Sequence, residues 1–383
     1  MQPSDTTVRA VPPRGRLGPF RLSQLLAAEA AVLAVVAGLT RGPIPTLIAA
    51  LLAAALLLIF FSRREHRWWT EHRLMSRALR LRRAARLDTR AGPILALLRT
   101  VGPGLTVRDL PSTDDGPPTG VARDDAGWFS IVALDPATGP VPLDALVTVL
   151  GTTDQPGLVL ELVTTTIPAP NPEVHPASPA ASSYRQLLES TPIPAFRETS
   201  ISVRVDARTL AEALLDHSAD PESAAALSAA LARRVVTSLR RTGITGRVLT
   251  AAETITTLAR SCDIEPGSPV DETWTHWRSA RLVHRTYWLK TWPAQATEIA
   301  PLFAWAATAP AAQTSVALIL KAAGPDVSVR AFIRLATHPD TDTTSLEHVL
   351  LNGARDAGAE LHPLDGEQGP ATYATAPTGG GAG

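Results

Sequence analysis

The 383-residue chain has few of the residues that build common catalytic and metal sites. It contains one cysteine, Cys262, which excludes an intramolecular disulfide and every metal site that needs several thiolates. Only two of its 36 basic residues are lysines, Lys290 and Lys321, and both follow leucine. A Walker A loop needs a lysine directly after glycine, so nucleotide hydrolysis by such a loop is excluded.

Other catalytic motifs are also missing, because the sequence has no GxSxG, HExxH or GxGxxG. Asp340 and Asp342 have the spacing of a metal-binding pair in glycosyltransferases, but their place before a predicted helix favours helix capping. Asp263, His276 and His284 lie near an aromatic cluster, yet no spacing assigns them as acid, base or nucleophile. We interpret the cluster as packed core or a partner surface; it comprises Trp274, Trp277, Tyr287, Trp288 and Trp292. We therefore predict no catalytic residue, no metal and no cofactor.

Two nearly uncharged runs within residues 21–62 predict a two-helix transmembrane hairpin. Residues 43–62 contain no charge, and twenty residues rising about 1.5 Å each cover the roughly 30 Å of hydrocarbon. The first run, residues 22–39, contains Glu29, whose carboxylate needs a partner in hydrocarbon. We expect Glu29 to contact another helix or to lie near the headgroups. A signal peptide is disfavoured because a second span follows at once, and a buried soluble hairpin is the other alternative.

Arginines surround this hairpin unevenly. Residues 1–90 carry a net charge of +10 and the remainder carries −10. The positive-inside rule therefore predicts a multi-pass protein of the inner membrane, with both termini in the cytoplasm and the short turn outside. Residues 1–20 form a cytosolic arm and residues 63–90 a basic juxtamembrane helix that lies on anionic headgroups or against a neighbouring protein. The predicted membrane anchors are Arg63, Arg64, Arg67, Trp68 and Trp69. Nucleic acid is not an expected partner, because the basic residues are confined to the membrane flank.

Residues 91–365 predict an α/β or α+β cytosolic domain with a mixed sheet. Strands are expected at 106–109, 128–134, 158–166, 200–205, 247–250, 285–292, 314–321 and 327–337. Helices are expected at 143–150, 184–190, 207–215, 221–241, 251–262, 295–307 and 344–357. Gly324-Pro325-Asp326 predicts a turn that makes the last two strands a hairpin. Residues 167–183 are rich in proline and predict a loop, and residues 366–383 predict a disordered tail.

Several phrases of the sequence occur in an order that is similar to one protein family. They are RREHRWWTEHR at residues 63–73, GVARDDAGWFSIVAL at 120–134, PIPAFRETSISVRVD at 192–206 and RTYWLKTWP at 285–293. Together with the hairpin, they resemble the EccE component of actinobacterial type VII secretion systems. The resemblance runs from about residue 17 to residue 361. None of the phrases is a catalytic signature, so the specificity lies in their succession.

The resemblance implies a non-catalytic membrane subunit that scaffolds an inner-membrane secretion core exporting small helical WXG-type proteins. It implies the EccB, EccC and EccD components as partners, beside the lipid bilayer, and no small-molecule substrate. The ATPase of such a core is EccC, which agrees with the missing Walker A loop. The alternatives are a membrane-anchored glycosyltransferase-like enzyme that uses Asp340 and Asp342, and a lipid-binding or envelope-associated scaffold without secretion partners.

Overall fold

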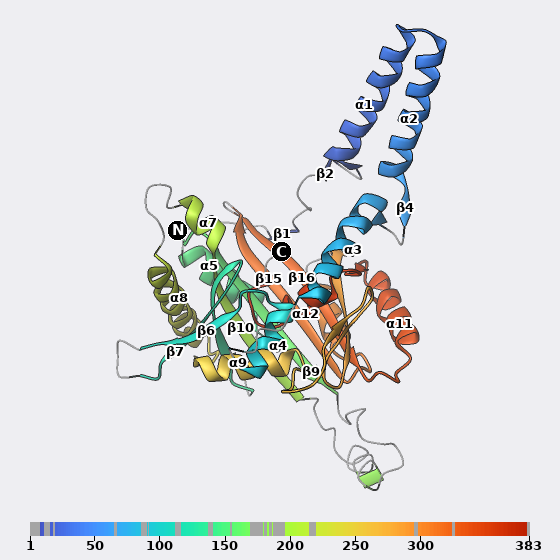
Figure 1. Ribbon diagram of the computed structural model, residues 1–383. Coiled ribbons are helices and arrows are strands. Elements are labelled where there is room, and N and C mark those ends of the chain that lie inside the picture. The colour runs from blue at the N-terminus through green and yellow to red at the C-terminus, as the bar shows by residue number, and fades with distance from the viewer. Residues whose placement is uncertain are drawn as a thin grey trace. The chain divides into compact units, whose positions relative to one another are not determined.

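The chain divides into two compact units in a computed structural model. One unit is Val11–Ala84, and the other combines Met1–Ala10 with Ala85–Gly383. The structure describes residues 8–10, 16–17, 20–64, 67–85, 90, 92–111, 116–136, 141–153, 155–168, 179, 182–183, 186, 196–213, 220–294, 298–323 and 326–380. The ribbon in Figure 1 follows both units.

The smaller unit contains two antiparallel helices, α1 (Leu22–Leu39) and α2 (Pro43–Phe61). Gly42 adopts a φ of 115°, and Pro43 occupies the first turn of α2, so glycine and proline together make the tight turn. Small residues let the helices approach closely: a Cβ added to Gly38 would lie 2.9 Å from the Cα of Thr46. At the other end, Gln24 donates a hydrogen bond of 2.9 Å to the carbonyl of Phe60.

Only α2 has the length and composition of a membrane span among the residues that the structure describes. It has 19 residues, whereas the apolar stretch Gln24–Leu39 of α1 is shorter. The structure therefore supports one candidate span where the sequence predicts two.

A short hairpin connects α2 to the basic helix α3 (Trp69–Ala84). Strand β4 (Arg63–Arg64) pairs antiparallel with β5 (Arg67–Trp68), and the N–H of Trp69 donates to the carbonyl of Ser62 at 3.0 Å. The first residue of α3 thus lies beside Ser62, the residue that directly follows α2. Before α1, β2 (Arg16–Leu17) pairs with β3 (Phe20–Arg21).

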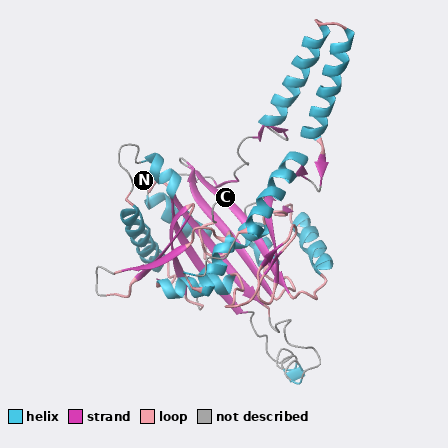
Figure 2. Ribbon diagram, in the orientation of Figure 1, coloured by secondary structure: helices cyan, strands magenta, loops and turns pink. Residues whose placement is uncertain are grey.

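The larger unit is built on one 13-stranded sheet. The main path has the order β12-β13-β14-β16-β15-β9-β10-β8-β7-β6, with β1, β11 and β17 attached at its sides. Every pair in this sheet is antiparallel except β1 with β16, which is parallel. The fold is therefore α+β, which is one of the two classes that the sequence predicts, and the sheet is almost entirely antiparallel where a mixed sheet was expected. Several strands that follow each other in the chain pair directly, as β15 and β16 do (Figure 2).

The strands of this sheet are β1 (Val8–Ala10), β6 (Thr106–Leu110), β7 (Thr119–Asp124), β8 (Gly127–Leu134), β9 (Leu158–Ile167), β10 (Phe196–Asp206), β11 (Gly246–Val248), β12 (Asp271–Glu272), β13 (Trp277–Arg278), β14 (Val283–Thr291), β15 (Gln313–Ala323), β16 (Asp326–Thr337) and β17 (Glu360–Pro363). The helices are α4 (Pro93–Val101), α5 (Leu143–Thr153), α7 (Ala207–Ala213), α8 (Pro221–Arg241), α9 (Ala251–Ser261), α10 (Ile299–Ala306), α11 (Thr343–Asp356) and α12 (Gln368–Tyr373).

All eight predicted strands are present, and so are the six predicted helices that fall on described residues. Helix α8 has its predicted bounds, because Asp220 caps it and Pro221 occupies its first turn. The predicted hairpin of β15 and β16 is confirmed up to the pair Ala323 and Asp326. The sequence reading missed α4, β7 and the short strands β12, β13 and β17. The helix expected at 184–190, apart from residue 186, and most of the loop expected at 167–183 lie outside the described residues.

The two faces of the sheet carry different cores, because successive side chains on a strand point to opposite faces. On one face, Leu160, Leu162 and Val203 pack with α5 and α8, and this core continues under α10 and α11. On the other face, Phe129 and Ile131 pack with α4 and α9. The second face also carries charged side chains, which are described below.

The C-terminal segment, defined here as residues 366–380, packs against that second face. It contains α12 and ends in a buried turn, and Thr375 and Thr378 have no exposed surface. The prediction that residues 366–383 form a disordered tail is therefore wrong for residues 366–380, and residues 381–383 lie outside the described part. The composition suggested disorder, but its glycines and small residues fit a narrow buried path.

Candidate functional site

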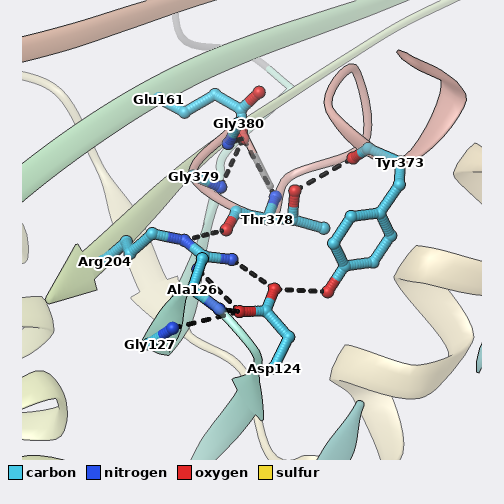
Figure 3. Close-up of polar contacts among 9 residues, drawn as sticks. All are labelled: Asp124, Ala126, Gly127, Glu161, Arg204, Tyr373, Thr378, Gly379 and Gly380. Atoms are coloured by element: carbon cyan, nitrogen blue, oxygen red, sulfur yellow. Dashed lines mark hydrogen bonds and ion pairs between the residues drawn. The ribbon is translucent and has the colours of Figure 1, made fainter. Parts of the chain in front are cut away.

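The second face of the sheet holds a buried polar network that binds the C-terminal segment (Figure 3). Glu161 and Arg204 reach it because they alternate with apolar neighbours that point to the opposite core. Glu161 pairs with Ser202 across β9 and β10, and Arg204 follows two residues later on the same face. Both side chains are almost completely buried. A buried ionisable group is costly unless its charge is paired or neutralised.

Arg204 and Asp124 form the centre of the network. The Nη1 and Nη2 atoms of Arg204 donate to the two carboxylate oxygens of Asp124 at 2.7 and 2.5 Å, and both side chains are at most 3% exposed. Asp124 also accepts the N–H groups of Ala126 and Gly127, at 2.9 and 3.2 Å, and the hydroxyl of Tyr373 at 2.8 Å. Burial raises the pKa of Tyr373 well above its ordinary value, so this hydroxyl keeps its proton and donates it. The ion pair thus joins the β7–β8 turn, β10 and the C-terminal segment.

The side chain of Glu161 binds backbone N–H groups at the end of the C-terminal segment. Its Oε2 atom accepts the N–H groups of Thr378, Gly379 and Gly380 at 2.9, 2.6 and 3.1 Å. Gly379 and Gly380 have φ values of 81° and 83°, which glycine adopts without strain, and successive N–H groups in such a turn form an anion-binding nest. The Nε atom of Arg204 donates to the carbonyl of Thr378 at 2.7 Å. A Cβ added to Gly379 would lie 2.6 Å from the Cβ of Arg204, so the fit requires glycine.

The protonation state of Glu161 follows from its burial. Burial raises the pKa of Glu161 to about 8, although the three N–H donors and the Arg204 charge oppose this shift. The carboxyl group is therefore largely protonated at neutral pH. Its Oε1 atom makes no hydrogen bond to described residues, which leaves that oxygen to carry the proton.

Further contacts hold the rest of the segment. Arg334 donates to the carbonyls of Thr372 and Ser261 at 3.3 and 2.7 Å, and Glu272 accepts the N–H of Gly369 at 2.9 Å. The side chain of Gln368 accepts the N–H of Thr286 at 2.9 Å. Most of the bonds to the segment use its backbone atoms. They therefore fix the path of its backbone and depend less on which side chains it carries.

The sequence candidates Asp263 and His284 meet in a second buried network, whereas His276 lies apart from it. The hydroxyl of Ser279 donates to Oδ2 of Asp263 at 2.6 Å and lies 2.9 Å from Nε2 of His284. Ser279 stands between the acid and the imidazole, unlike the catalytic order in which histidine is central. Burial lowers the pKa of His284 well below its ordinary value, so the ring is neutral. Arg281 covers the outer side of Asp263 at 2.8 Å.

Two members of the aromatic cluster, Trp277 and Tyr287, lie in the core, as one of the two interpretations of the cluster predicts. Trp277 and Tyr287 are 2% and 1% exposed, and the ring of Trp277 lies 5.1 Å from that of His284. This contact supports the reading of Asp263, Ser279 and His284 as a structural network.

Asp342 caps helix α11, as the sequence predicts. Its carboxylate accepts the N–H groups of Thr344 and Ser345 at 3.1 and 3.4 Å and the hydroxyl of Ser345 at 2.6 Å. Asp340 is exposed in the preceding turn. No cluster of three or more His, Cys, Asp or Glu side chains that could hold a metal occurs among the described residues.

The predicted membrane residues belong to the smaller unit. The backbones of Arg63, Arg64, Arg67 and Trp68 form β4 and β5, and their side chains are outside the described part of the structure. The guanidinium carbon of Arg73 lies 4.4 Å above the ring of Trp69. Glu29 is exposed on the surface of α1.

A comparison with protein families gives a match over part of the chain. Residues 193–289 match the family model described as "Putative type VII ESX secretion system translocon, EccE". The match confirms the resemblance to EccE. The matched range begins just before β10 and runs into β14, so it includes Arg204, Asp263 and His284. EccE is a component of the type VII secretion translocon. A comparison with curated proteins gives no match.

Sequence reasoning missed the central network, although a signal was present. Glu161 stands in the run Leu158–Ile167 and Arg204 in the run Phe196–Asp206, each as a charged residue among buried neighbours. A lone charge at an inward position of a strand indicates a buried partner. The partners Asp124 and Tyr373 could not be identified, because the sequence does not show which distant segments meet.

The pH dependence of stability is expected to report the proton on Glu161. The folded state keeps this proton up to a pKa of about 8, whereas the unfolded chain releases it near the ordinary value of 4.5. The folded state therefore binds more protons in this window, and its free energy of unfolding should fall as the pH rises through it. The fall should be a few kcal/mol, with about 5 kcal/mol as the upper limit at roughly 1.4 kcal/mol per pKa unit. Urea unfolding of the detergent-solubilised chain at several pH values measures it.

Glu161→Gln is the matched variant, because its amide oxygen still accepts the three N–H groups but does not ionise. Its stability should change less with pH than that of the wild type. His284 and other groups titrate equally in both proteins, so the difference isolates Glu161. Parallel pH profiles for the two proteins would contradict the raised pKa.

The Arg204–Asp124 ion pair gives a second prediction. Arg204→Met removes one partner and leaves the Asp124 carboxylate buried without a counter-charge, so unfolding should become easier by about 3–5 kcal/mol. Adding Asp124→Asn removes that charge and should restore part of the loss. Arg208→Met, which breaks an exposed ion pair with Glu212, is the control and should cost less than about 0.5 kcal/mol. Equal losses for Arg204→Met and Arg208→Met would show that the buried pair has no special role.

Proposed function

We propose that this protein is a non-catalytic membrane subunit of a type VII secretion translocon, which scaffolds the inner-membrane assembly that exports small helical WXG-type proteins. The observation that carries the proposal is the match of residues 193–289 to the EccE family. By the same resemblance, its partners are the EccB, EccC and EccD components. The cargo and the energy source belong to the assembly, and this subunit supplies binding surfaces.

The arrangement of polar residues supports a scaffold. The buried carboxylates Asp124 and Asp263 accept hydrogen bonds that hold the fold together, and the Asp342 carboxylate caps a helix. These side chains are already engaged in structural contacts. The glycosyltransferase-like alternative would need Asp340 and Asp342 to bind a cation, and nothing in the described structure favours it.

The membrane anchor is proposed to be a two-span hairpin of α1 and α2. Helix α1 has 18 residues, which at about 1.5 Å each approach the thickness of the hydrocarbon core. It packs closely on α2 and contains one acidic residue, Glu29. The carboxylate of Glu29 is exposed on the isolated chain, so we propose that it contacts a transmembrane helix of another subunit. The arginine asymmetry supports an orientation with both termini in the cytoplasm.

Affinity purification from membranes tests the proposed assembly. The wild-type chain should purify with the EccB, EccC and EccD components. Asp340→Asn with Asp342→Asn keeps hydrogen-bond acceptors at the cap, so this variant should purify with the same subunits and support secretion of WXG-type proteins at near wild-type level. Glu29→Leu should insert normally and recover several-fold less of the other subunits.

Each result bears on one part of the proposal. A wild-type chain that recovers no translocon subunit would remove the secretion role. Metal-dependent binding of a nucleotide sugar that is lost in the double aspartate variant would support the enzyme instead. If Glu29→Leu recovers the other subunits as fully as the wild type does, Glu29 makes no contact that the assembly needs.

Cysteine labelling tests the topology, because Cys262 is completely buried. Val349 is 58% exposed on α11, and Thr40 is exposed in the turn between α1 and α2. With a membrane-impermeant maleimide, Thr40→Cys should react in intact spheroplasts and Val349→Cys only in inside-out vesicles. The reverse pattern would invert the proposed orientation, and labelling of both positions from the same side would exclude the two-span hairpin.

A further inference from the structure

Helix α3 presents two parallel rows of side chains on its exposed surface. Arg73, Arg77 and Arg80 are exposed and recur at helical spacing, so they form one row. Leu74 and Leu81 form the adjacent row, and each is 66% exposed although it is a large apolar residue. They are two turns apart, at about 3.6 residues per turn, and therefore point in the same direction.

The opposite side of α3 is buried and contains its acidic residue. Glu71 is 8% exposed and Leu79 is 7% exposed. Glu71 is the one acid in the helix, so the outer surface combines arginines and leucines without a carboxylate. This combination matches an interfacial helix, in which guanidinium groups bind phosphates while leucines enter the acyl boundary.

The tight connection to α2 fixes where this surface lies. The hydrogen bond of 3.0 Å between the Trp69 N–H and the Ser62 carbonyl places the start of α3 at the end of α2. If α2 spans the bilayer, as the proposed function requires, then Trp69 lies at the level of the headgroups. The contact of Arg73 with the Trp69 ring adds an aromatic group suited to that level.

We infer that α3 lies along the cytoplasmic leaflet and binds anionic phospholipids, with Arg73, Arg77 and Arg80 on headgroup phosphates and Leu74 and Leu81 in the acyl boundary. The inference rests on the proposed membrane hairpin and adds a lipid-composition dependence to it. Charge complementarity selects an anionic lipid surface as the occupant, because the exposed face carries only positive charge and apolar surface. An acidic protein partner would need no inserted leucines.

Site-specific fluorescence on the full-length chain tests the inference. An environment-sensitive probe is attached to Leu81→Cys and, in a separate variant, to Leu74→Cys. The natural Cys262 is buried, so the probe reacts with the introduced cysteine. The protein is reconstituted in vesicles of phosphatidylcholine alone or with phosphatidylglycerol, and iodide on both sides of the membrane quenches water-exposed probes. With phosphatidylglycerol, quenching at both positions should be several-fold weaker than at Val349→Cys, and it should increase in phosphatidylcholine alone.

The arginine row is tested by charge removal. Replacing Arg73, Arg77 and Arg80 with glutamine should lower the bound-to-free ratio of α3 by up to about 100-fold, since each basic residue near such a surface contributes about fivefold. The matched control replaces the exposed Arg240, Arg241 and Arg278, which removes the same charge elsewhere and should leave quenching at Leu81→Cys unchanged.

Carbonate extraction separates the two levels of the proposal. A chain that stays in the vesicles while its Leu81 and Leu74 probes are quenched like Val349→Cys would overturn the α3 inference and leave the hairpin intact. Protection that is the same in both lipids and in the arginine variant would overturn the anionic-lipid recognition. A chain that carbonate removes would overturn the hairpin and the inference together.

Discussion

The bidentate pair of Arg204 with Asp124 is the interaction on which the larger unit depends. It joins residues that are 80 positions apart in the chain, and the same Asp124 carboxylate accepts the hydroxyl of Tyr373, 249 positions away. In a buried site such a pair is stable only when nearly all remaining donors and acceptors are satisfied. The two N–H groups of the β7–β8 turn and the carbonyl of Thr378 complete it. The geometry of three distant segments is therefore set at one point.

The charged face of the sheet also explains why the two cores differ. One face is covered by α5, α8, α10 and α11 through apolar contacts, which tolerate changes of shape. The other face combines an apolar patch around Phe129 with buried charges that need specific partners. Hydrogen-bonded partners impose one arrangement, so this face determines the path of the C-terminal segment.

The sequence predicted most elements and few of the connections between them. Helix α8 and the strands β8, β10 and β16 followed from periodicity, capping residues and turns, which are local signals. The sequence left the class open between α/β and α+β, because alternating strands and helices are common to parallel and antiparallel sheets. Residues 366–380 were misjudged. Their glycine-rich composition suggested disorder, but here Gly379 and Gly380 provide the positive φ values that direct three N–H groups at Glu161.

The contacts of the C-terminal segment also bear on how the larger unit folds. Tyr373 and Thr378 bind residues of β7, β9 and β10 that lie 249, 217 and 174 positions earlier in the chain. Contacts between residues so far apart form slowly, because the entropy of closing a long loop is lost before the contact contributes stability. The charged face of the sheet therefore gains its cover late in folding and stays open to water until these long-range contacts form.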